Sequence, residues 1–173
     1  MAELAPAMPS RAVRWVAAEN IHLTLKFLGD VPAVQLGAIA EGMGRAAARC
    51  QPFAFDVGGL GCFPNPRRPS VLWVGIQENS GALAALQKAV EEEMARLGYP
   101  PEGRPFSPHL TLGRVRRECR PADWAVIGSA VTKIIPKPLG RQEVTAIRLY
   151  QSDLRPAGPI YTMLAEAPLG KRS

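Results

Sequence analysis

The spacing of apolar residues along the chain predicts a mixture of helices and strands. Apolar residues at every third or fourth position predict helices over residues 34–50, 81–97 and 121–129. Shorter apolar runs, bounded by Gly, Pro or Asp, predict strands over residues 21–28, 53–57, 71–76, 108–115, 144–150 and 160–166. No stretch between these elements is long enough to be a linker between independent domains, so residues 1–173 are expected to form one domain.

Two of the predicted strands carry the same tetrapeptide. The chain has two histidines, and they begin the segments His22-Leu23-Thr24-Leu25 and His109-Leu110-Thr111-Leu112. From the chain's own content of Leu and Thr, a given histidine is followed by Leu-Thr-Leu by chance in about 3 of 10,000 cases. The repeat therefore indicates an internal duplication.

The alternation of side chains in a strand separates each motif into two faces. His22, Thr24 and Lys26 share one face of the first predicted strand, and the leucines between them share the other. His109 and Thr111 share a face of the second predicted strand in the same way. Two such strands lying side by side would present two imidazoles and two hydroxyls to one cleft.

This set of groups suits acid–base chemistry on a phosphate. An unperturbed imidazole titrates near pH 6.5, so one histidine can accept a proton while the other donates one. Threonine hydroxyls can donate hydrogen bonds to the oxygens of a phosphate between them. Arg114 would add a cation to this site, provided that the strand twists or bulges at Gly113, because in a regular strand Arg114 lies on the face of Leu110.

Other residues near the motifs have two interpretations each. Lys26 is either a phosphate contact or a surface charge, and Phe106 either stacks on a base or belongs to the core. The tryptophans are expected in the core rather than as base-stacking platforms. With no third histidine and no carboxylate in either motif, we expect no metal site and no cofactor.

Composition narrows the class of protein. A content of 47% hydrophobic residues in 173 excludes a disordered chain, and no apolar run approaches the ~18 residues that a membrane span needs. The 21 basic and 15 acidic residues give a net charge of +6, which favours RNA or nucleotides as partners, although many soluble proteins are mildly basic. Residues 1–13 are expected to be loose and lack a secretory signal, and the three separated cysteines indicate a reduced, cytoplasmic chain.

The segments around the two motifs resemble a known superfamily. Residues 14–29 and 106–115, and the tail over residues 149–161, are similar to the two-histidine (2H) phosphoesterases, in particular to the RNA 2′,3′-cyclic phosphodiesterases, also described as 2′-5′ RNA ligases. The resemblance implies a bilobal α+β fold with two pseudo-symmetric halves. Each half would have an antiparallel sheet facing a central cleft and helices outside.

The resemblance also implies an activity and roles for the motif residues. The implied reaction is metal-free hydrolysis of a 2′,3′-cyclic phosphate on RNA or a nucleotide to a 2′-phosphate. His22 would be the proton donor to O3′, His109 would activate the water as a base, and Thr24 and Thr111 would hold the phosphate. Two alternatives remain open: a 2′-5′ RNA ligase that joins RNA halves, and a non-catalytic protein that binds RNA or nucleotides.

The two halves differ in what precedes the motif. A strand and a long helix are predicted before His109, starting 38 residues upstream at Val71, whereas only 21 residues precede His22. The first half is therefore expected to lack its opening strand and helix, through a mis-assigned start, a truncated gene or replacement by a partner chain. An exposed sheet edge and apolar face would then cause poor solubility or dimerisation.

Overall fold

The computed structural model describes residues 4–9, 11–134, 139–155 and 158–170. The chain divides into two compact units: the first unit comprises residues 1–24, 56–77 and 108–141, and the second unit comprises residues 25–55, 78–107 and 142–173. Each unit draws on both halves of the sequence, so the structural units are interleaved along the chain. Both combine helices with antiparallel strands, which confirms the predicted α+β class.

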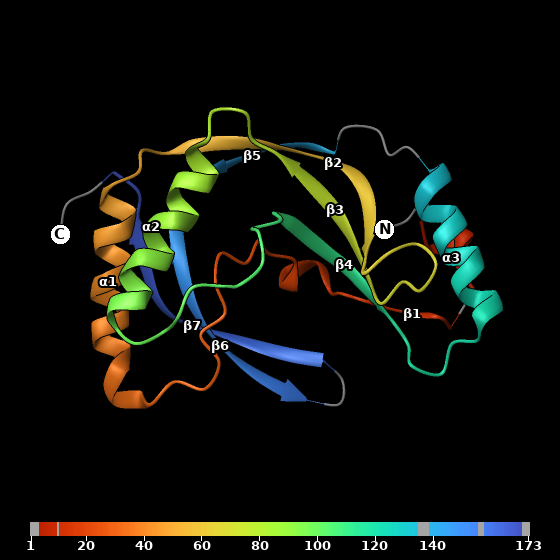
Figure 1. Cartoon of the computed structure of the whole chain (residues 1–173), viewed down its shortest axis with the longest axis horizontal. Helices are drawn as coiled ribbons and strands as arrows, with labels where there is room; N and C mark the ends of the chain where they lie inside the picture. The colour runs from red at the N-terminus through yellow and green to blue at the C-terminus, as the bar shows by residue number, and fades with distance from the viewer. Residues whose placement is uncertain (1–3, 10, 135–138, 156–157, 171–173) are drawn as a thin grey trace. The chain divides into compact units, whose positions relative to one another are not determined.

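The first unit is built on an antiparallel sheet (Figure 1). Its strands follow the order β1-β4-β3-β2-β5, with these bounds: β1 Val13–Trp15, β4 His109–Val115, β3 Val71–Gln77, β2 Phe53–Phe63 and β5 Gly140–Val144. Helix α3 (Pro121–Lys133) supplies Ile127 and Val131 to a core with Val13, Cys62 and Leu72. One face of this sheet is therefore the core face, and the side chains of alternate residues point to the other face.

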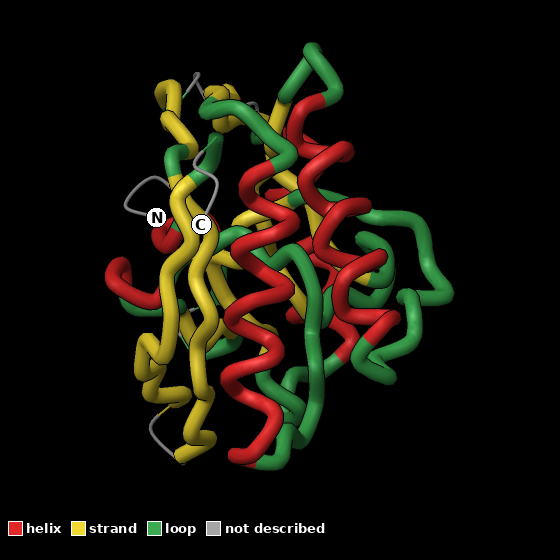
Figure 2. The backbone as a smooth tube through the Cα atoms, turned by 90° about the vertical axis from the view of Figure 1, so that its left-hand side faces the viewer, coloured by secondary structure: helices red, strands yellow, loops and turns green. Residues whose placement is uncertain are grey.

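The second unit packs two helices with a long hairpin (Figure 2). Its elements are α1 (Leu36–Ala48), α2 (Ala82–Arg96), β6 (Ala146–Arg155) and β7 (Gly158–Pro168). Ile39, Leu86 and Met94 are fully buried in the core that these elements share. A Cβ atom added to Gly42 of α1 would lie 3.1 Å from Cε of Met94, so this glycine allows the two helices to approach closely.

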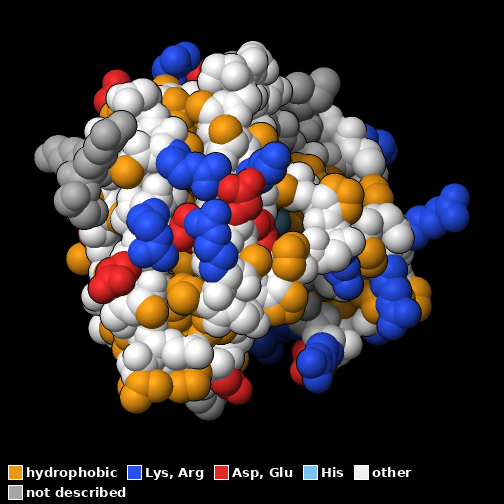
Figure 3. Space-filling model, turned by 60° about the vertical axis from the view of Figure 1, so that its left-hand side comes forward, with side chains coloured by type: hydrophobic (Ala, Val, Ile, Leu, Met, Phe, Trp, Pro, Cys, Tyr) orange, Lys and Arg blue, Asp and Glu red, His pale blue; other side chains and the backbone are white. Residues whose placement is uncertain are grey.

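Ion pairs join α1 and α2. Arg45 and Arg96 both bond to the carboxylate of Glu93, and Arg49 bonds to Glu92 at 2.8 Å. Figure 3 shows Lys and Arg side chains beside Asp and Glu side chains on one face of the molecule. The arginines of these two helices thus have acidic neighbours. None of the helices in the described residues is long and apolar enough to cross a membrane.

The long helices confirm the predictions from apolar spacing, and so do most of the predicted strands. Residues 21–28, predicted as a strand, form a single bridge in which Leu23 pairs with Leu110. Strand β2 extends beyond the predicted end at residue 57, through Gly58 and Gly59, and contains a bulge there. Three short 3-10 helices, at Ala5–Ala7, Ala18–Asn20 and Ala33–Gln35, complete the described elements.

Several described residues within the segment 1–13, which the sequence predicted to be loose, are buried. Leu4 is 7% exposed and joins a core with Val74 and Leu112, and Met8 and Ala12 are buried beside α3. These apolar side chains, which lie among prolines, therefore pack against the sheet of the first unit. Because prolines interrupt the segment, the sequence predicted no regular element there and did not predict their burial. In the described part of residues 1–13, buried apolar side chains are thus found where a loose segment was predicted.

Candidate active site

The two repeated motifs meet in the first unit, where Leu23 of the first motif forms a bridge with strand β4 of the second. Strand β4 carries His109 and Thr111, and the bridge between Leu23 and Leu110 is antiparallel. In this register the residues that flank the bridge oppose each other, so that His22 faces Thr111 and Thr24 faces His109. The histidine of each motif therefore lies across from the threonine of the other, as the predicted pairing of strands requires.

A backbone hydrogen bond orients the first imidazole. Nδ1 of His22 lies 2.8 Å from the carbonyl oxygen of Asn20, the last residue of a 3-10 helix (Ala18–Asn20). A carbonyl oxygen only accepts, so Nδ1 carries a proton and donates it to this bond. Nε2 is then the nitrogen at which His22 gains or loses a proton. Sequence reasoning missed Asn20 in this role, because the bond uses its main-chain atom.

Two aromatic rings flank the second imidazole. The ring centroids of His109 and Phe63 are 5.0 Å apart with the planes at 80°, and those of His109 and Trp73 are 6.2 Å apart. Trp73 pairs with Thr111 across β3 and β4, which places its indole on the face of the motif. A Cβ on Gly61 would lie 2.2 Å from the indole, so the tryptophan occupies the space above this glycine.

These aromatic neighbours were not recognised from the sequence. Trp73 was expected in the core, and it is half-buried on the opposite face of the sheet. A signal existed in the alternation of β3, where Leu72 and Val74 are buried on the core face and residue 73 between them must point away. Which side chain lies beside His109 depends on the register between strands, which the sequence of one strand does not contain.

A β-bulge turns Arg114 to the face of the motif. The pairs along β3 and β4 change from Trp73 with Thr111 to Leu72 with Gly113, so β4 contains one extra residue at this point. The extra residue reverses the alternation, and Arg114 pairs with Val71 on the face that also carries Thr111. The condition set by the sequence, a bulge at Gly113, is met.

Glycine is required at the bulge because its Cα lies against the core side of β1. A Cβ on Gly113 would lie 2.7 Å from Cγ1 of Val13 and 3.1 Å from Cε3 of Trp15. The first of these distances is shorter than carbon atoms tolerate, so any larger residue would push β1 away from β4. The glycine thus permits the strand pairing and the change of face together.

Lys26 was interpreted as either a phosphate contact or a surface charge, and in the structure it forms a buried ion pair. Its Nζ atom donates to Oε2 of Glu91 at 2.7 Å and to the carbonyl oxygen of Pro100 at 2.8 Å, and its side chain is 3% exposed. These partners belong to the second unit, as Lys26 does. The strand over residues 21–28 that would have aligned Lys26 with His22 is not formed, and the ammonium group has a structural ion pair instead.

Phe106 also lies in the second unit, half-buried in the loop before β4. The four motif residues and Arg114 lie in the first unit. Five of the seven residues singled out from the sequence therefore belong to one unit. In the described residues, no three His, Cys, Asp or Glu side chains gather in a group that could hold a metal ion.

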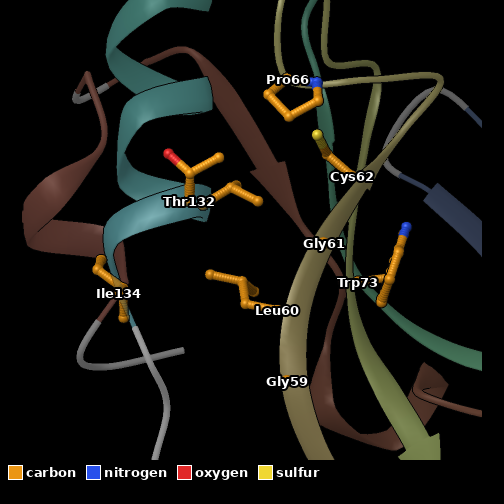
Figure 4. A pocket seen from close by; sticks show the side chains of 9 residues that line it. Gly59, Leu60, Gly61, Cys62, Pro66, Trp73, Thr132 and Ile134 are labelled. Atoms are coloured by element: carbon orange, nitrogen blue, oxygen red, sulfur yellow. The ribbon is translucent and has the colours of Figure 1, made fainter.

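A pocket of about 470 Å³ opens elsewhere in the first unit. Its walls come from β2, α3 and Trp73, and the lining residues include Leu60, Cys62, Thr132 and Ile134 (Figure 4). None of the motif residues lines it. Burial raises the pKa of the Cys62 thiol, which makes this cysteine a poor nucleophile at neutral pH. The pocket is mainly apolar and is separate from the histidines.

Comparisons with known proteins agree with this geometry. The family model described as LigT like phosphoesterase matches the chain twice, over residues 1–73 and 74–161. A protein of Archaeoglobus fulgidus named RNA 2′,3′-cyclic phosphodiesterase is 40% identical over 149 residues, which cover 86% of this chain and 80% of that protein. A protein of the same name from Methanothermobacter thermautotrophicus is 37% identical over 150 residues, covering 87% of this chain and 79% of the relative.

Solved structures show the same fold. A protein of Thermus thermophilus superposes with a TM-score of 0.79 at 25% identity, covering 99% of this chain and 91% of that one. Escherichia coli LigT complexed with 3′-AMP superposes with a TM-score of 0.74 at 30% identity, covering 98% and 88%. The repeated match of one family model to the two parts of the sequence agrees with the duplication inferred from the tetrapeptides.

Proposed function

The chain belongs to the LigT-like phosphoesterase family, and on that premise we propose that it hydrolyses the 2′,3′-cyclic phosphate end of RNA or of a nucleotide to a 2′-phosphate. The observation that carries the proposal is the antiparallel bridge between Leu23 and Leu110, whose register sets each histidine opposite a threonine of the other motif. The names of the relatives, RNA 2′,3′-cyclic phosphodiesterase, support the substrate class.

The reaction needs one proton removed and one supplied. His109 takes a proton from water, and the water oxygen attacks phosphorus. The bond from phosphorus to O3′ breaks as His22 gives its Nε2 proton to O3′, which leaves as a hydroxyl group. The proton gained by His109 and the one lost by His22 are exchanged with solvent before the next cycle. The assignment of the acid to His22 follows the family resemblance.

The hydrogen bond to Asn20 suits His22 to this role. Since Nδ1 donates to a carbonyl oxygen in both protonation states, protonation changes only Nε2. The ring therefore does not need to turn between donating a proton and regaining one. A ring held in this way loses less conformational freedom in the transition state.

Thr24 and Thr111 would hold the phosphate from both sides. Each hydroxyl can donate a hydrogen bond to a non-bridging oxygen, and the antiparallel register of the Leu23–Leu110 bridge supports a position for each one opposite the histidine of the other motif. Arg114 lies on the same face through the bulge and would bind the substrate beside the reacting phosphate. Proton transfer and substrate binding are then both supplied by side chains of the first unit.

The first test is hydrolysis of adenosine 2′,3′-cyclic phosphate by the full chain in the presence of EDTA, with the product identified by phosphorus NMR. We expect a 2′-phosphate. His22→Ala and His109→Ala should each lower kcat by about 10²–10⁴-fold, the usual contribution of a general acid or base. Glu19→Ala, which changes an exposed charge three residues from His22, is the matched control and should retain activity.

The outcomes separate the alternatives. A 3′-phosphate product would overturn the assignment of O3′ as the leaving group, and activity that survives both histidine substitutions would overturn the mechanism. No turnover by the folded chain, on the nucleotide or on an RNA with a cyclic end, would favour a binding protein. Ligation uses the same groups with a 5′-hydroxyl in place of water: His109 takes the proton of the 5′-hydroxyl, its oxygen attacks phosphorus, and His22 protonates O3′ as it leaves. RNA joined by a 2′-5′ bond should therefore form slowly from a 5′-hydroxyl end and a cyclic end, and its formation should be lost in the same variants.

A further inference from the structure

Two arginines face each other directly on the sheet of the first unit. Arg14 in β1 and Arg114 in β4 are partners in the strand register, and both side chains are exposed. Like charges directly opposite each other across a strand pair destabilise the pair. A sheet that retains two guanidinium groups at one cross-strand position therefore suggests an anion that compensates them.

Acidic residues in the described part of the chain do not provide this compensation. Among these residues, neither Arg14 nor Arg114 forms an ion pair with a carboxylate. Other arginines do so: Arg45 and Arg148 bond to glutamates at 2.8 and 2.6 Å. What distinguishes Arg14 and Arg114 is that they are direct cross-strand partners, so that each guanidinium group lies next to a like charge. A negatively charged ligand bound between them would remove this repulsion.

The pair lies on the face of the proposed active site. The neighbouring pair Val13 with Val115 points to the core beside α3, so the residues next to them point away from it. The bulge at Gly113 brings this outward face into line with Thr111. From Thr111 to Arg114 the strand advances about 7–10 Å, allowing for the bulge, so the arginines lie beyond the phosphate that reacts.

We propose that Arg14 and Arg114 bind the phosphodiester adjacent to the terminal cyclic phosphate, so that an RNA chain is the preferred substrate over a mononucleotide. This inference rests on the proposed function. The next negative group on an RNA with a cyclic end is the phosphodiester that joins the last two nucleosides. Two guanidinium groups, each able to donate two parallel hydrogen bonds, suit the oxygens of such a phosphate. A cyclic mononucleotide has no group at this position.

The test compares two substrates in one assay: a cyclic mononucleotide, and a trinucleotide with the same terminal base and a 2′,3′-cyclic end. Arg14→Gln should lower kcat/KM for the trinucleotide about ten-fold and for the mononucleotide less than two-fold, since one charge-assisted contact is lost only from the longer substrate. Arg14→Lys should fall between, because it keeps the charge and loses the paired hydrogen bonds.

Salt dependence and stability provide independent readouts. The slope of log(kcat/KM) against log salt for the trinucleotide should become shallower by about one in Arg14→Gln. Its melting temperature should stay equal or rise, because a like-charge pair has been removed, whereas a structural role for Arg14 would lower it. Arg117→Gln, which removes an exposed arginine from the turn after β4, is the matched control and should change none of these values.

The result that overturns the inference is an equal effect of Arg14→Gln on both substrates, or no effect on either. If the wild-type chain hydrolyses neither substrate, the proposed function fails, and the arginine pair is tested by binding instead. A fluorescent trinucleotide with a 2′-phosphate end should then bind the wild type about ten-fold more tightly than Arg14→Gln. Equal dissociation constants would reject the pair as a phosphate site.

Discussion

Replacing Lys26 by Met tests whether this lysine stabilises the protein or contacts substrate. Methionine keeps the length of the side chain and removes the ammonium group, which bonds to Glu91 at 2.7 Å and to the carbonyl of Pro100 at 2.8 Å. The two side chains of the ion pair are 3% and 12% exposed, so the pair is nearly buried. The substitution would leave the carboxylate of Glu91 without its cation.

The magnitude follows from this burial. Removing one partner of a buried ion pair costs about 3–5 kcal/mol. The carboxylate of Glu91 keeps a hydrogen bond from Gln87 at 3.2 Å and some exposure to water, which lowers the expected loss to about 2–4 kcal/mol. For a chain of this length that loss corresponds to a fall in melting temperature of about 5–15 °C.

Urea unfolding at neutral pH, followed by far-UV circular dichroism, measures the effect as a fall in the midpoint at constant slope. Lys88→Met removes an exposed lysine from the same helix as Glu91 and should change stability by less than about 0.5 kcal/mol. Adding Glu91→Gln to Lys26→Met should recover part of the loss, because no charge is then left unpaired. A stability unchanged in Lys26→Met, together with a higher KM, would refute this reasoning and return Lys26 to the substrate site.

Three further changes test other parts of the structure. Gly113→Ala should lower stability by about 1–3 kcal/mol, because its Cβ would lie 2.7 Å from Val13; an unchanged melting temperature would contradict the close approach. Burial raises the pKa of the Glu93 carboxyl, but hydrogen bonds from arginines, Arg45 among them, outweigh this and leave the pKa below its usual value. Ionised Glu93 therefore stabilises the fold at pH values above the usual carboxyl pKa, and this contribution is lost as the pH falls. Glu93→Gln should lower the free energy of unfolding by about 1 kcal/mol at pH 7 and by progressively less below pH 4.5, as measured by urea unfolding at each pH. The hairpin of β6 and β7 exposes apolar side chains, including Leu154 at 81%, so the chain should self-associate at high concentration and Leu154→Asn should weaken this; sedimentation velocity showing one monomeric species at all concentrations would argue against it.

The elements that could be predicted are those whose signal is local. Helix α2 has its apolar residues at helical spacing and Gly98 after its end, and the structure contains it within the expected bounds. Strand β4 was predicted from the motif that also indicated acid–base chemistry. Leu alternates with His and Thr in this motif, so one pattern predicts both the strand and the face that carries His109 and Thr111. From the sequence, a twist or bulge at Gly113 was only the condition for Arg114 to reach the site, and the structure has a bulge next to this glycine.

The remaining features depend on partners distant in the sequence. Lys26 alternates correctly with His22 for a strand, yet its ammonium group lies against Glu91, 65 residues further along the chain. Phe63 and Trp73 lie beside His109 because of the register between strands, and nothing within either segment specifies that register. Arg14 lies in a segment that resembles the family, and the proposed phosphate site depends on its cross-strand pairing with Arg114, which the sequence does not show.

The interleaving of the two units has a consequence for how the protein can be divided. The chain passes from one unit to the other after residues 24, 55, 77, 107 and 141, so neither unit is a continuous stretch of sequence. Cutting the gene at any of these passages leaves at least one unit split between the fragments, and the fragments should not be stable by themselves. Co-expressed fragments could regain activity only by assembling with each other. The first of these passages directly follows Thr24, and the fourth directly precedes Pro108. The peptides beside the two motifs are therefore poor sites for inserting a tag or a fused domain.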